Sequence, residues 1–373
     1  MKPLEGVLVL ALEQAVAAPL CSCRLADAGA RVIKIERAEG DFARGYDRVI
    51  HGESAYFVWL NRGKESVTLN LKAPEDFQLV LRILEQADVL VQNFKPGALV
   101  RMGLDLAELR RRNPRLITCN ISGFGETGPY RDRKSYDLLV QAESGLASVT
   151  GAPEAPGRVG VSIGDITTGM AAYEAILEAL IARGATGPGR DISISIFDVL
   201  ADLMTVPLMH YDYGGKAPKR VGLRHPSIAP YGVYTTQDGA PLLISIQNER
   251  EWGRFCEVVL RQPELGEDER FCTNVVRVRN RPELEVLISA VFAACTREKM
   301  LARLLESDTA YGELNDMAGL SAHPHLRRVS VDTSTGPANI PAPPPLVNGE
   351  VPVLQGIPAL GAHTAQVRQE FGG

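Results

Sequence analysis

The chain has 373 residues, enough for two domains of ordinary size. Hydrophobic residues make up 45% and charged residues 23%, values that exclude a disordered or collagen-like chain. The formal net charge is −5, so there is no basic excess for a nucleic-acid backbone, and we expect no nucleic-acid partner. Six cysteines are too few for a disulfide scaffold and favour a reducing, cytoplasmic setting.

The first apolar run covers residues 6–12 and is flanked by Glu5 and Glu13. It is short for the core of a secretory signal peptide, and the flanking acids do not fit one. A continuous apolar run of this length is typical of a strand buried on both faces of a parallel sheet. No stretch approaches the roughly eighteen apolar residues of a membrane span, so we expect no membrane segment.

Strand and helix patterns alternate through the first half of the chain. Strands are predicted at 6–12, 32–35, 66–71, 88–92, 116–121 and 191–196. Helices are predicted at 19–27, 76–86, 105–112, 138–149, 166–183 and 197–211. This alternation predicts an α/β fold with a doubly wound, mostly parallel, Rossmann-like sheet in a large domain over residues 1–200.

The second half of the chain has a different pattern. Strands are expected at 226–234 and 242–246, and helices at 249–260 and 281–305, which predicts a smaller α+β domain over residues 225–325. Residues 337–345 are rich in proline and are predicted to form a connecting loop. Residues 330–373 are then expected to return and complete the large domain.

Three motifs in the chain lack the context that a cofactor or metal site requires. Residues 123–128 spell G-x-G-x-x-G, but the loop-forming segment 129–134 follows where a dinucleotide site needs a helix. Cys21 and Cys23 lack the spacing of metal-binding pairs. His323 and His325 have no acidic companion nearby, so no metal site is predicted.

Asp165 stands where the long helix at 166–183 should begin. The structural interpretation is a helix N-cap, a role that aspartate often has. The functional interpretation is a nucleophile, because helix-end N–H groups and the helix dipole would hold the carboxylate ionised. Gly164 and Gly169 would let a ligand approach its oxygens.

Several motifs in the same order resemble the class III coenzyme A transferases. This family includes the carnitine and formyl-CoA transferases and α-methylacyl-CoA racemase. The motifs lie at Leu25–Glu36, Asn61–Lys64, Val91–Gly97, Gly123–Pro129, Gly164–Asp165 and Ala362–Thr364. The resemblance implies that Asp165 is catalytic, that acyl-CoA is a substrate without any permanently bound cofactor, and that the protein forms an interlocked homodimer.

The resemblance also implies a set of coenzyme A contacts. The matching positions are Ala15, Arg37, Leu69, Lys72, Asn93, Phe94, Arg101 and Lys134. The basic members of this set are suited to phosphate groups, and Leu69 and Phe94 to the two sides of an adenine.

Residues 135–137 help to separate transferases from racemases. The racemases of this family have Gly-His-Asp where this chain has Ser135, Tyr136 and Asp137. A tyrosine with a pKa near 10 is a poor acid/base group at neutral pH, so the transferase interpretation is favoured. The alternatives are a racemase or epimerase and a CoA-binding protein without activity.

The substrate class follows from the resemblance as well. The chain lacks the glycine run of the formyl-CoA enzymes, and Gln14 and Val16 replace a histidine and a glutamine of those enzymes, which argues against an oxalate or formate donor. Residues 224–232 and 246–252 resemble relatives that act on C4–C5 dicarboxylates. We expect CoA to move from succinyl-CoA, or another dicarboxylyl-CoA, to an acid such as itaconate, mesaconate, citramalate or malate.

The expected mechanism uses an aspartyl–acyl anhydride and an aspartyl-CoA thioester at Asp165. Backbone N–H groups of the glycine-flanked segments are expected to stabilise the oxyanions. Tyr136 is predicted to orient a carboxylate. Arg44 or Arg224 is predicted to bind the distal carboxylate of the diacid.

Overall fold

The computed structural model describes residues 2–372 and divides them into two compact units. The large unit contains residues 2–146, 158–206 and 327–372. The small unit contains residues 147–157 and 207–326. Residues 147–157 thus lie in the small unit, although they fall within the range 1–200 predicted for the large domain.

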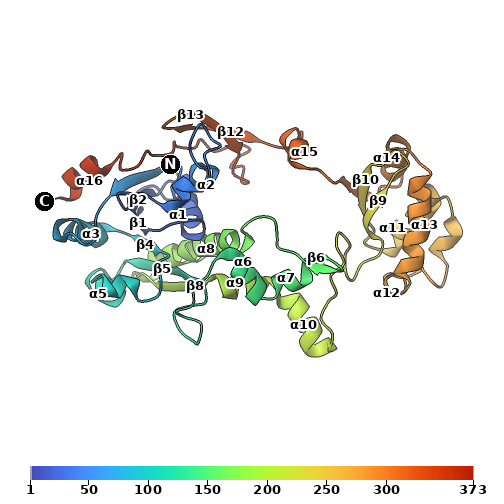
Figure 1. The fold of residues 1–373 in the computed structure, drawn as a ribbon, viewed down its shortest axis with the longest axis horizontal. Helices are drawn as coiled ribbons and strands as arrows, with labels where there is room; N and C mark the ends of the chain where they lie inside the picture. Colours follow the sequence, from blue (N-terminus) through green and yellow to red (C-terminus); the bar gives the residue numbers. More distant parts are fainter. Residues whose placement is uncertain (1, 373) are drawn as a thin grey trace. The chain divides into compact units, whose positions relative to one another are not determined.

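The large unit is built on a six-stranded sheet (Figure 1). Its strands are β1 (Leu8–Leu12), β2 (Arg31–Glu36), β3 (Lys64–Thr68), β4 (Val89–Gln92), β5 (Ile117–Ser122) and β8 (Asp191–Ser195). They lie in the order β3-β2-β1-β4-β5-β8, and every neighbouring pair is parallel. The strand order reverses between β1 and β4, the point where ligands bind in such sheets. The prediction of an α/β fold with a parallel sheet is confirmed.

Helices pack on both faces of this sheet. One face packs against α1 (Ala17–Asp27) and α8 (Ile163–Thr186), and the other against α3 (Pro74–Gln86), α5 (Leu106–Arg112) and α16 (Thr364–Phe371). Successive residues of a strand point to opposite faces of the sheet, and each face has its own hydrophobic core. Val9 therefore faces α1, and Leu10 faces α3. Helices α1 and α8 are in close contact at Gly169, where a Cβ atom would lie 2.5 Å from the Ala17 carbonyl oxygen.

Shorter elements complete the large unit. These are η1 (Phe42–Gly45), α2 (Ala55–Leu60), α4 (Ala98–Arg101), α6 (Asp137–Glu143), α9 (Ile196–Leu203) and the hairpin β12 (Arg328–Thr333) and β13 (Gly336–Pro341). The predicted loop at 337–345 is therefore wrong over its first five residues. Each strand of a two-stranded ladder has one unpaired edge, so Pro337 and Pro341 fit into β13. The predicted helix at 138–149 is divided into α6 and α7 (Leu146–Val149).

The small unit has a three-stranded antiparallel sheet in the order β11-β10-β9. Its elements are β9 (Tyr231–Thr235), β10 (Pro241–Ser245), α11 (Glu249–Arg254), α12 (Asn274–Arg279), α13 (Arg281–Ala293), α14 (Arg297–Glu306), β11 (Ala310–Glu313) and α15 (Met317–Ser321), with the two-residue strands β6 (Gly151–Ala152) and β7 (Ala155–Pro156). Trp252, Phe255 and Phe292 lie in its core. Helix α10 (Thr205–Gly214) connects the two units in sequence. Among the helices of residues 2–372, none has the length and apolar character to span a membrane.

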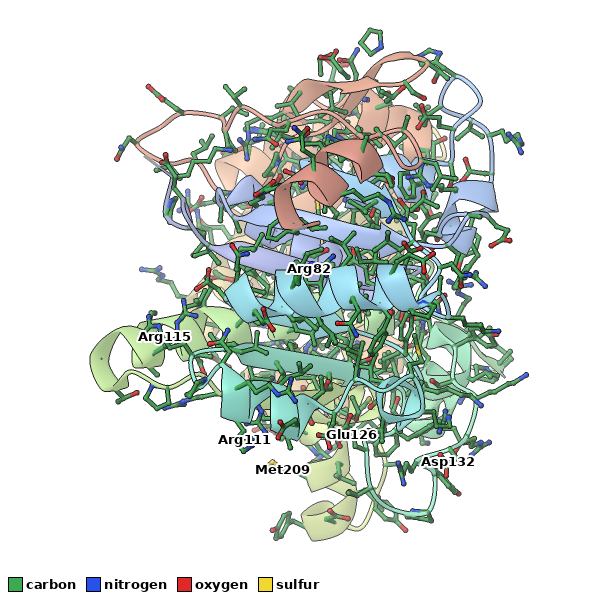
Figure 2. All side chains as sticks on the ribbon, turned by 90° about the vertical axis from the view of Figure 1, so that its left-hand side faces the viewer. Arg82, Arg111, Arg115, Glu126, Asp132 and Met209 are labelled. Carbon is green, nitrogen blue, oxygen red and sulfur yellow. The ribbon has the colours of Figure 1, made fainter. Side chains whose placement is uncertain are left out.

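The C-terminal segment lies along the edge strand β3. Ser66 accepts hydrogen bonds at its carbonyl from His363 N (3.0 Å) and at its hydroxyl from Gly361 N (2.9 Å). Thr364 Oγ1 accepts from Thr68 N (2.9 Å). Beyond it, α16 packs beside α3, and Arg82 Nε donates to the Phe371 carbonyl at 2.5 Å (Figure 2). The chain end thereby completes the sheet edge, as a strand would.

Four fully buried charged side chains connect the three neighbouring strands β1, β2 and β3. Lys64 Nζ donates to Glu13 Oε1 at 2.6 Å, and Lys34 Nζ donates to Asp41 Oδ2 at 2.7 Å and lies 3.5 Å from Glu13 Oε1. All four side chains have 0% exposure. Burial alone would raise the pKa of Glu13, but the two lysines hold it below its usual value. We call Glu13, Lys34, Asp41 and Lys64 the buried charge cluster.

Replacing Lys34 by methionine tests this cluster. Lys34→Met removes one positive charge and leaves the Asp41 carboxylate buried without its ion-pair partner. The free energy of unfolding should fall by about 3–5 kcal/mol, measured by urea denaturation. The matched control is Lys299→Met on the exposed surface of α14, which should change stability little. Equal unfolding midpoints for the two variants would contradict the role assigned to the cluster.

Candidate functional site

Two adjoining cavities lie at the carboxyl ends of the parallel strands. The larger has a volume of about 890 Å³ and the smaller about 310 Å³. Gln14, Phe94 and Lys95 line both cavities, so the two share a wall. Gln14 follows β1 and Phe94 follows β4, which places this wall where the strand order reverses. This is the expected position of a ligand site in an open α/β sheet.

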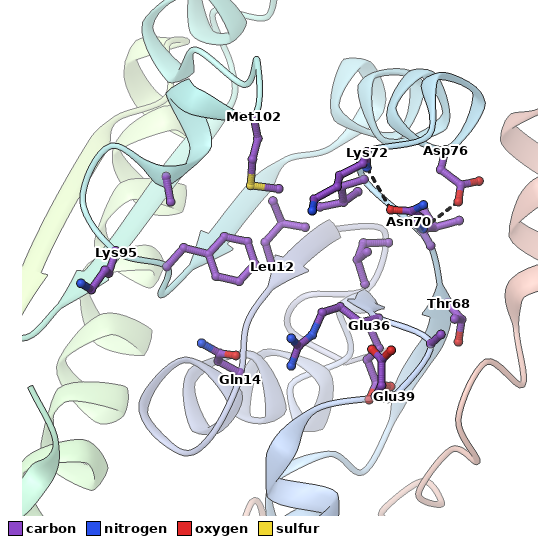
Figure 3. Close-up of a pocket in the computed structure, with 17 residues that line it drawn as sticks. Leu12, Gln14, Glu36, Glu39, Thr68, Asn70, Lys72, Asp76, Lys95 and Met102 are labelled. Atoms are coloured by element: carbon purple, nitrogen blue, oxygen red, sulfur yellow. Dashed lines mark hydrogen bonds between the residues drawn. The ribbon is translucent and has the colours of Figure 1, made fainter. Parts of the chain in front are cut away.

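The larger cavity is lined by apolar side chains together with three basic residues and three acidic ones, namely Arg37, Lys72, Lys95, Glu36, Glu39 and Asp76. Figure 3 shows Met102 and Gln14 at opposite ends and Leu12 between them. Four of the residues predicted to contact coenzyme A line it, namely Arg37, Leu69, Lys72 and Phe94. Its size and mixed lining are typical of a site for a nucleotide-sized ligand.

The smaller cavity contains the carboxylate of Asp165. The predicted residues Ala15, Asn93, Lys134 and Tyr136 line it as well. Its cationic lining residues are Lys95, Arg131, Arg133 and Lys134, and Asp165 is its one carboxylate. Among these cations, Arg133 is paired with Glu143 at 2.6 Å. The cavity is therefore positively charged around a single acid, which favours an anionic ligand.

Three predicted residues lie outside the lining of both cavities. Arg101 is at the exposed end of α4. Arg44 donates twice to Glu36, with both N–O distances 2.8 Å, and its guanidinium lies 3.7 Å from the centre of the Phe57 ring. Arg224 lies in the small unit and is paired with Glu285 at 2.8 Å. Arg44 and Arg224 thus already have carboxylate partners within the chain.

The turn Gln14–Ala15 between the cavities is held from two sides. Asn93 Oδ1 accepts from Gln14 N (3.0 Å), and Asn93 Nδ2 donates to the Gln14 carbonyl (2.8 Å). Ala15 has φ of 67°, a left-handed conformation that is costly for alanine, and its N–H donates to Asp41 Oδ1 (3.1 Å). The buried charge cluster therefore maintains the conformation of this turn.

Asp165 is the third residue of α8 and not its N-cap. The helix begins at Ile163 with Ser162 as N-cap, and Ser162 makes no capping hydrogen bond with its side chain. The N–H groups of Gly164 and Asp165 donate instead to Asp137 Oδ1, at 2.7 and 3.2 Å. The N-cap interpretation of Asp165 is wrong because a carboxylate from another helix satisfies these donors. For the same reason, these two N–H groups are not available as oxyanion donors.

The Asp165 carboxylate has no hydrogen-bond donor among residues 2–372. Burial, together with the nearby Asp137, raises its pKa from the ordinary value of 3.8 to about 7. The expectation that helix-end donors hold it ionised is therefore wrong, because Asp137 occupies those donors. Asp165 is a carboxylate on a cavity wall that takes up a proton near neutral pH.

Tyr46 is a site residue that the sequence analysis missed. It lines the smaller cavity together with Phe42, and the two rings lie 5.6 Å apart. Burial raises the pKa of Tyr46 to about 12, with Asp41 and Asp165 adding to the effect, so its hydroxyl remains a hydrogen-bond donor. Its signal was weak, because it lies just after a short 3-10 helix in a segment without apolar periodicity.

After the glycines at 123–128 the chain continues as a loop, and the next helix begins at Asp137. Within residues 2–372, no cluster of three histidine, cysteine, aspartate or glutamate side chains could hold a metal ion.

A Rossmann-like sheet with a large cavity at its switch point and an unpartnered carboxylate in the adjoining cavity is typical of an enzyme active site. The sequence model of CoA-transferase family III matches residues 4–364, and the chain belongs to this family. It is therefore an enzyme with CoA-transferase activity.

Similar proteins support this assignment over the full length. The chain is 36% identical to a succinate–glutarate CoA-transferase from Agrobacterium fabrum, covering 99% of this chain and 96% of the relative. It is also 36% identical to an acetyl-CoA:oxalate CoA-transferase from Acetobacter aceti, with the same coverage. The crystal structure of a CAIB/BAIF family protein from Brucella suis has a TM-score of 0.84 and 36% identity, covering 99% of both chains.

Proposed function

We propose that Asp165 is the nucleophile of a CoA transfer between dicarboxylic acids. An oxygen of its carboxylate attacks the thioester carbon of the donor acyl-CoA, the C–S bond breaks, and the CoA thiolate leaves. The thiolate then attacks the Asp165 carbonyl carbon of this mixed anhydride and releases the donor acid, which forms an aspartyl-CoA thioester. The acceptor carboxylate enters by the same two steps in reverse order, and Asp165 is regenerated.

The observation that carries this proposal is the position of Asp165. Its carboxylate has no donor partner in residues 2–372 and lines a cavity that adjoins the larger one. A CoA thioester whose nucleotide occupies the larger cavity would extend past Phe94 to reach Asp165. Arg37 and Lys72 would meet its phosphates, Leu69 its adenine, and Ala15, Asn93 and Lys134 the path to the thioester. Arg101, at the exposed end of α4, would contact coenzyme A from the rim of the larger cavity.

Dicarboxylates are the acids that we propose as donor and acceptor. The named substrates of the two relatives include succinate, glutarate and oxalate, and the charge of the smaller cavity favours such anions. Tyr136 would orient the reacting carboxylate. Arg131 is the best candidate for the distal carboxylate, because it lines this cavity and has no ion pair within residues 2–372, unlike Arg44 and Arg224. Succinyl-CoA as donor, with itaconate, mesaconate, citramalate or malate as acceptor, remains our proposal.

We also propose that the enzyme works in the cytoplasm as an interlocked homodimer, without a permanently bound cofactor. All six cysteines are free thiols, which fits a reducing compartment. The large unit is built from both ends of the chain, as the interlocked arrangement requires. Helix α10 buries none of its residues and exposes Val206, Leu208, Met209, Tyr211 and Tyr213. An apolar helix of this kind needs a covering surface, and a second copy of the chain would provide it.

Asp165→Ala and the isosteric Asp165→Asn should abolish transfer, because no nucleophile remains. Both variants should retain the circular dichroism spectrum and the CoA affinity of the wild type. In the wild type, hydroxylamine or borohydride added after acyl-CoA should modify Asp165 alone, as found by peptide mass spectrometry. Unchanged turnover of either variant would overturn the mechanism. Deuterium uptake at the α-carbon without an acid co-substrate would favour the racemase alternative.

The pH dependence follows from the pKa of Asp165, raised to about 7. Attack requires the ionised form, so kcat/KM for acyl-CoA should rise about tenfold per unit of pH below 7 and level off above it. Because this pKa is higher in the folded than in the unfolded chain, protonated Asp165 stabilises the fold at low pH. That contribution is lost as the pH rises through about 7. A rate that is independent of pH between 5 and 8 would contradict this assignment.

The dimer can be tested by light scattering coupled to gel filtration. The wild type should have twice the mass of one chain. The double variant Leu208→Lys, Tyr211→Lys places two charges on the exposed face of α10 and should shift the protein towards the monomer. A monomeric wild type would rule out the interlocked arrangement.

A further inference from the structure

The start of α8 is held by a carboxylate from another helix. Asp137, the first residue of α6, accepts the N–H groups of Gly164 and Asp165 at one oxygen, Oδ1. The first N–H groups of a helix have no partner within it, and a buried donor left unpaired is costly. Asp137 therefore replaces the capping bond that Ser162 does not make.

Gly164 makes this approach possible. A Cβ atom on Gly164 would lie 3.0 Å from Asp137 Oδ1 and 2.9 Å from Ile196 Cγ2. Any side chain here would push Asp137 or α9 away from α8. The glycine directly before Asp165 thus lets α6, α8 and α9 meet at the nucleophile.

The Asp137 carboxylate is itself held by the side-chain amide of Gln141. Its Oδ2 accepts from Gln141 Nε2 at 2.6 Å, and Gln141 Oε1 accepts from Val159 N at 3.0 Å. Asp137 and Gln141 are both buried, with 8% and 0% exposure. The chain of bonds leads from the loop before α8, through α6, to the backbone of Asp165. Such a fully satisfied buried network favours a single geometry.

The charge of Asp137 acts on Asp165 at close range. Together with burial, it raises the pKa of the Asp165 carboxyl. The other titratable or charged side chains on the same cavity are Tyr46, Lys95, Arg131, Arg133, Lys134 and Tyr136. Helix α9, packed beside α8, carries Asp198 and Asp202, and α1 carries Arg24 and Asp27, which lie near Tyr173, two turns further along α8.

We propose that Asp137 is a positioning residue of this transferase, which fixes the main chain of Asp165 and, through its negative charge, sets the pH range in which that carboxylate can attack. The proposal rests on the function proposed for Asp165. It assigns two separable effects to one side chain, a hydrogen-bonding effect on geometry and an electrostatic effect on ionisation.

Asp137→Asn separates the two effects. The asparagine retains an oxygen for the two N–H groups but carries no charge. The acid limb of the kcat/KM profile should therefore move to lower pH by about one unit, with a melting temperature close to that of the wild type. Asp137→Ser, also neutral, should move the limb in the same direction and provides the test if the asparagine variant does not fold. An acid limb that stays in place in these variants overturns the proposal.

Asp137→Ala tests the hydrogen-bonding effect. It leaves both N–H groups without their acceptor, so kcat should fall roughly tenfold or more even at pH 9, where Asp165 is ionised. A purely structural role would lower the melting temperature without moving the pH profile. An Asp137→Ala variant with the kcat of the wild type at pH 9 would overturn the geometric part.

Asp198→Asn is the matched control. It removes a carboxylate from α9 that accepts from Ser195 Oγ at 2.6 Å and lies outside the lining of both cavities. It should leave the acid limb where the wild type has it, and a shift equal to that of Asp137→Asn would count against a specific effect of Asp137. An active Asp165→Ala would overturn the proposed function. An inactive Asp165→Ala with an unmoved limb in Asp137→Asn would overturn the present inference alone.

Discussion

The structure depends on the buried charge cluster of Glu13, Lys34, Asp41 and Lys64. The side chains of two acids and two lysines are completely removed from water and compensate one another, so the segments that carry them are fixed relative to one another. Glu13 follows β1, Lys34 lies in β2 and Lys64 begins β3. Asp41 transmits this constraint to the left-handed Ala15, on the wall of the smaller cavity. Interactions within the sheet thus determine the shape of the site above it.

Asp165 illustrates a second balance of forces. A carboxylate in a partly dry cavity beside another carboxylate is unfavourable in its charged form. Asp137 is held in place beside it by two backbone N–H groups and the side-chain amide of Gln141. Lys95, Arg131 and Lys134 on the same cavity wall, none of them in an ion pair within residues 2–372, favour an anionic ligand. In the mechanism that we propose, binding and reactivity thus belong to different side chains of a single cavity.

Local patterns predicted the parallel sheet well, because continuous apolar runs and alternating helices report burial directly. They failed where partners come from distant parts of the chain. Asp165 has the sequence context of an N-cap, and only the fold brings Asp137 to the donors that it was expected to use. Sequence spacing does not show that Arg44 is the partner of Glu36. Pro337 and Pro341 argued against a strand, although a two-stranded ladder can accommodate both of them. The sequence signal of Tyr46 was weak, because its position in the cavity depends on tertiary packing.

The attachment of the chain end to β3 has a consequence for biosynthesis. Ser66 and Thr68 form their bonds to residues 361–364, which follow them in the sequence by 295 residues or more and are therefore translated much later. Until then, β3 is an exposed edge strand with unpaired N–H and C=O groups, and it can pair with a neighbouring nascent chain. The small unit is translated while the outer edge of β3 has no partner. The time needed to translate it therefore lengthens the period in which β3 can pair with another chain. The edge of the sheet is therefore covered only after the whole small unit, which lies between the two partners in the sequence, has been translated.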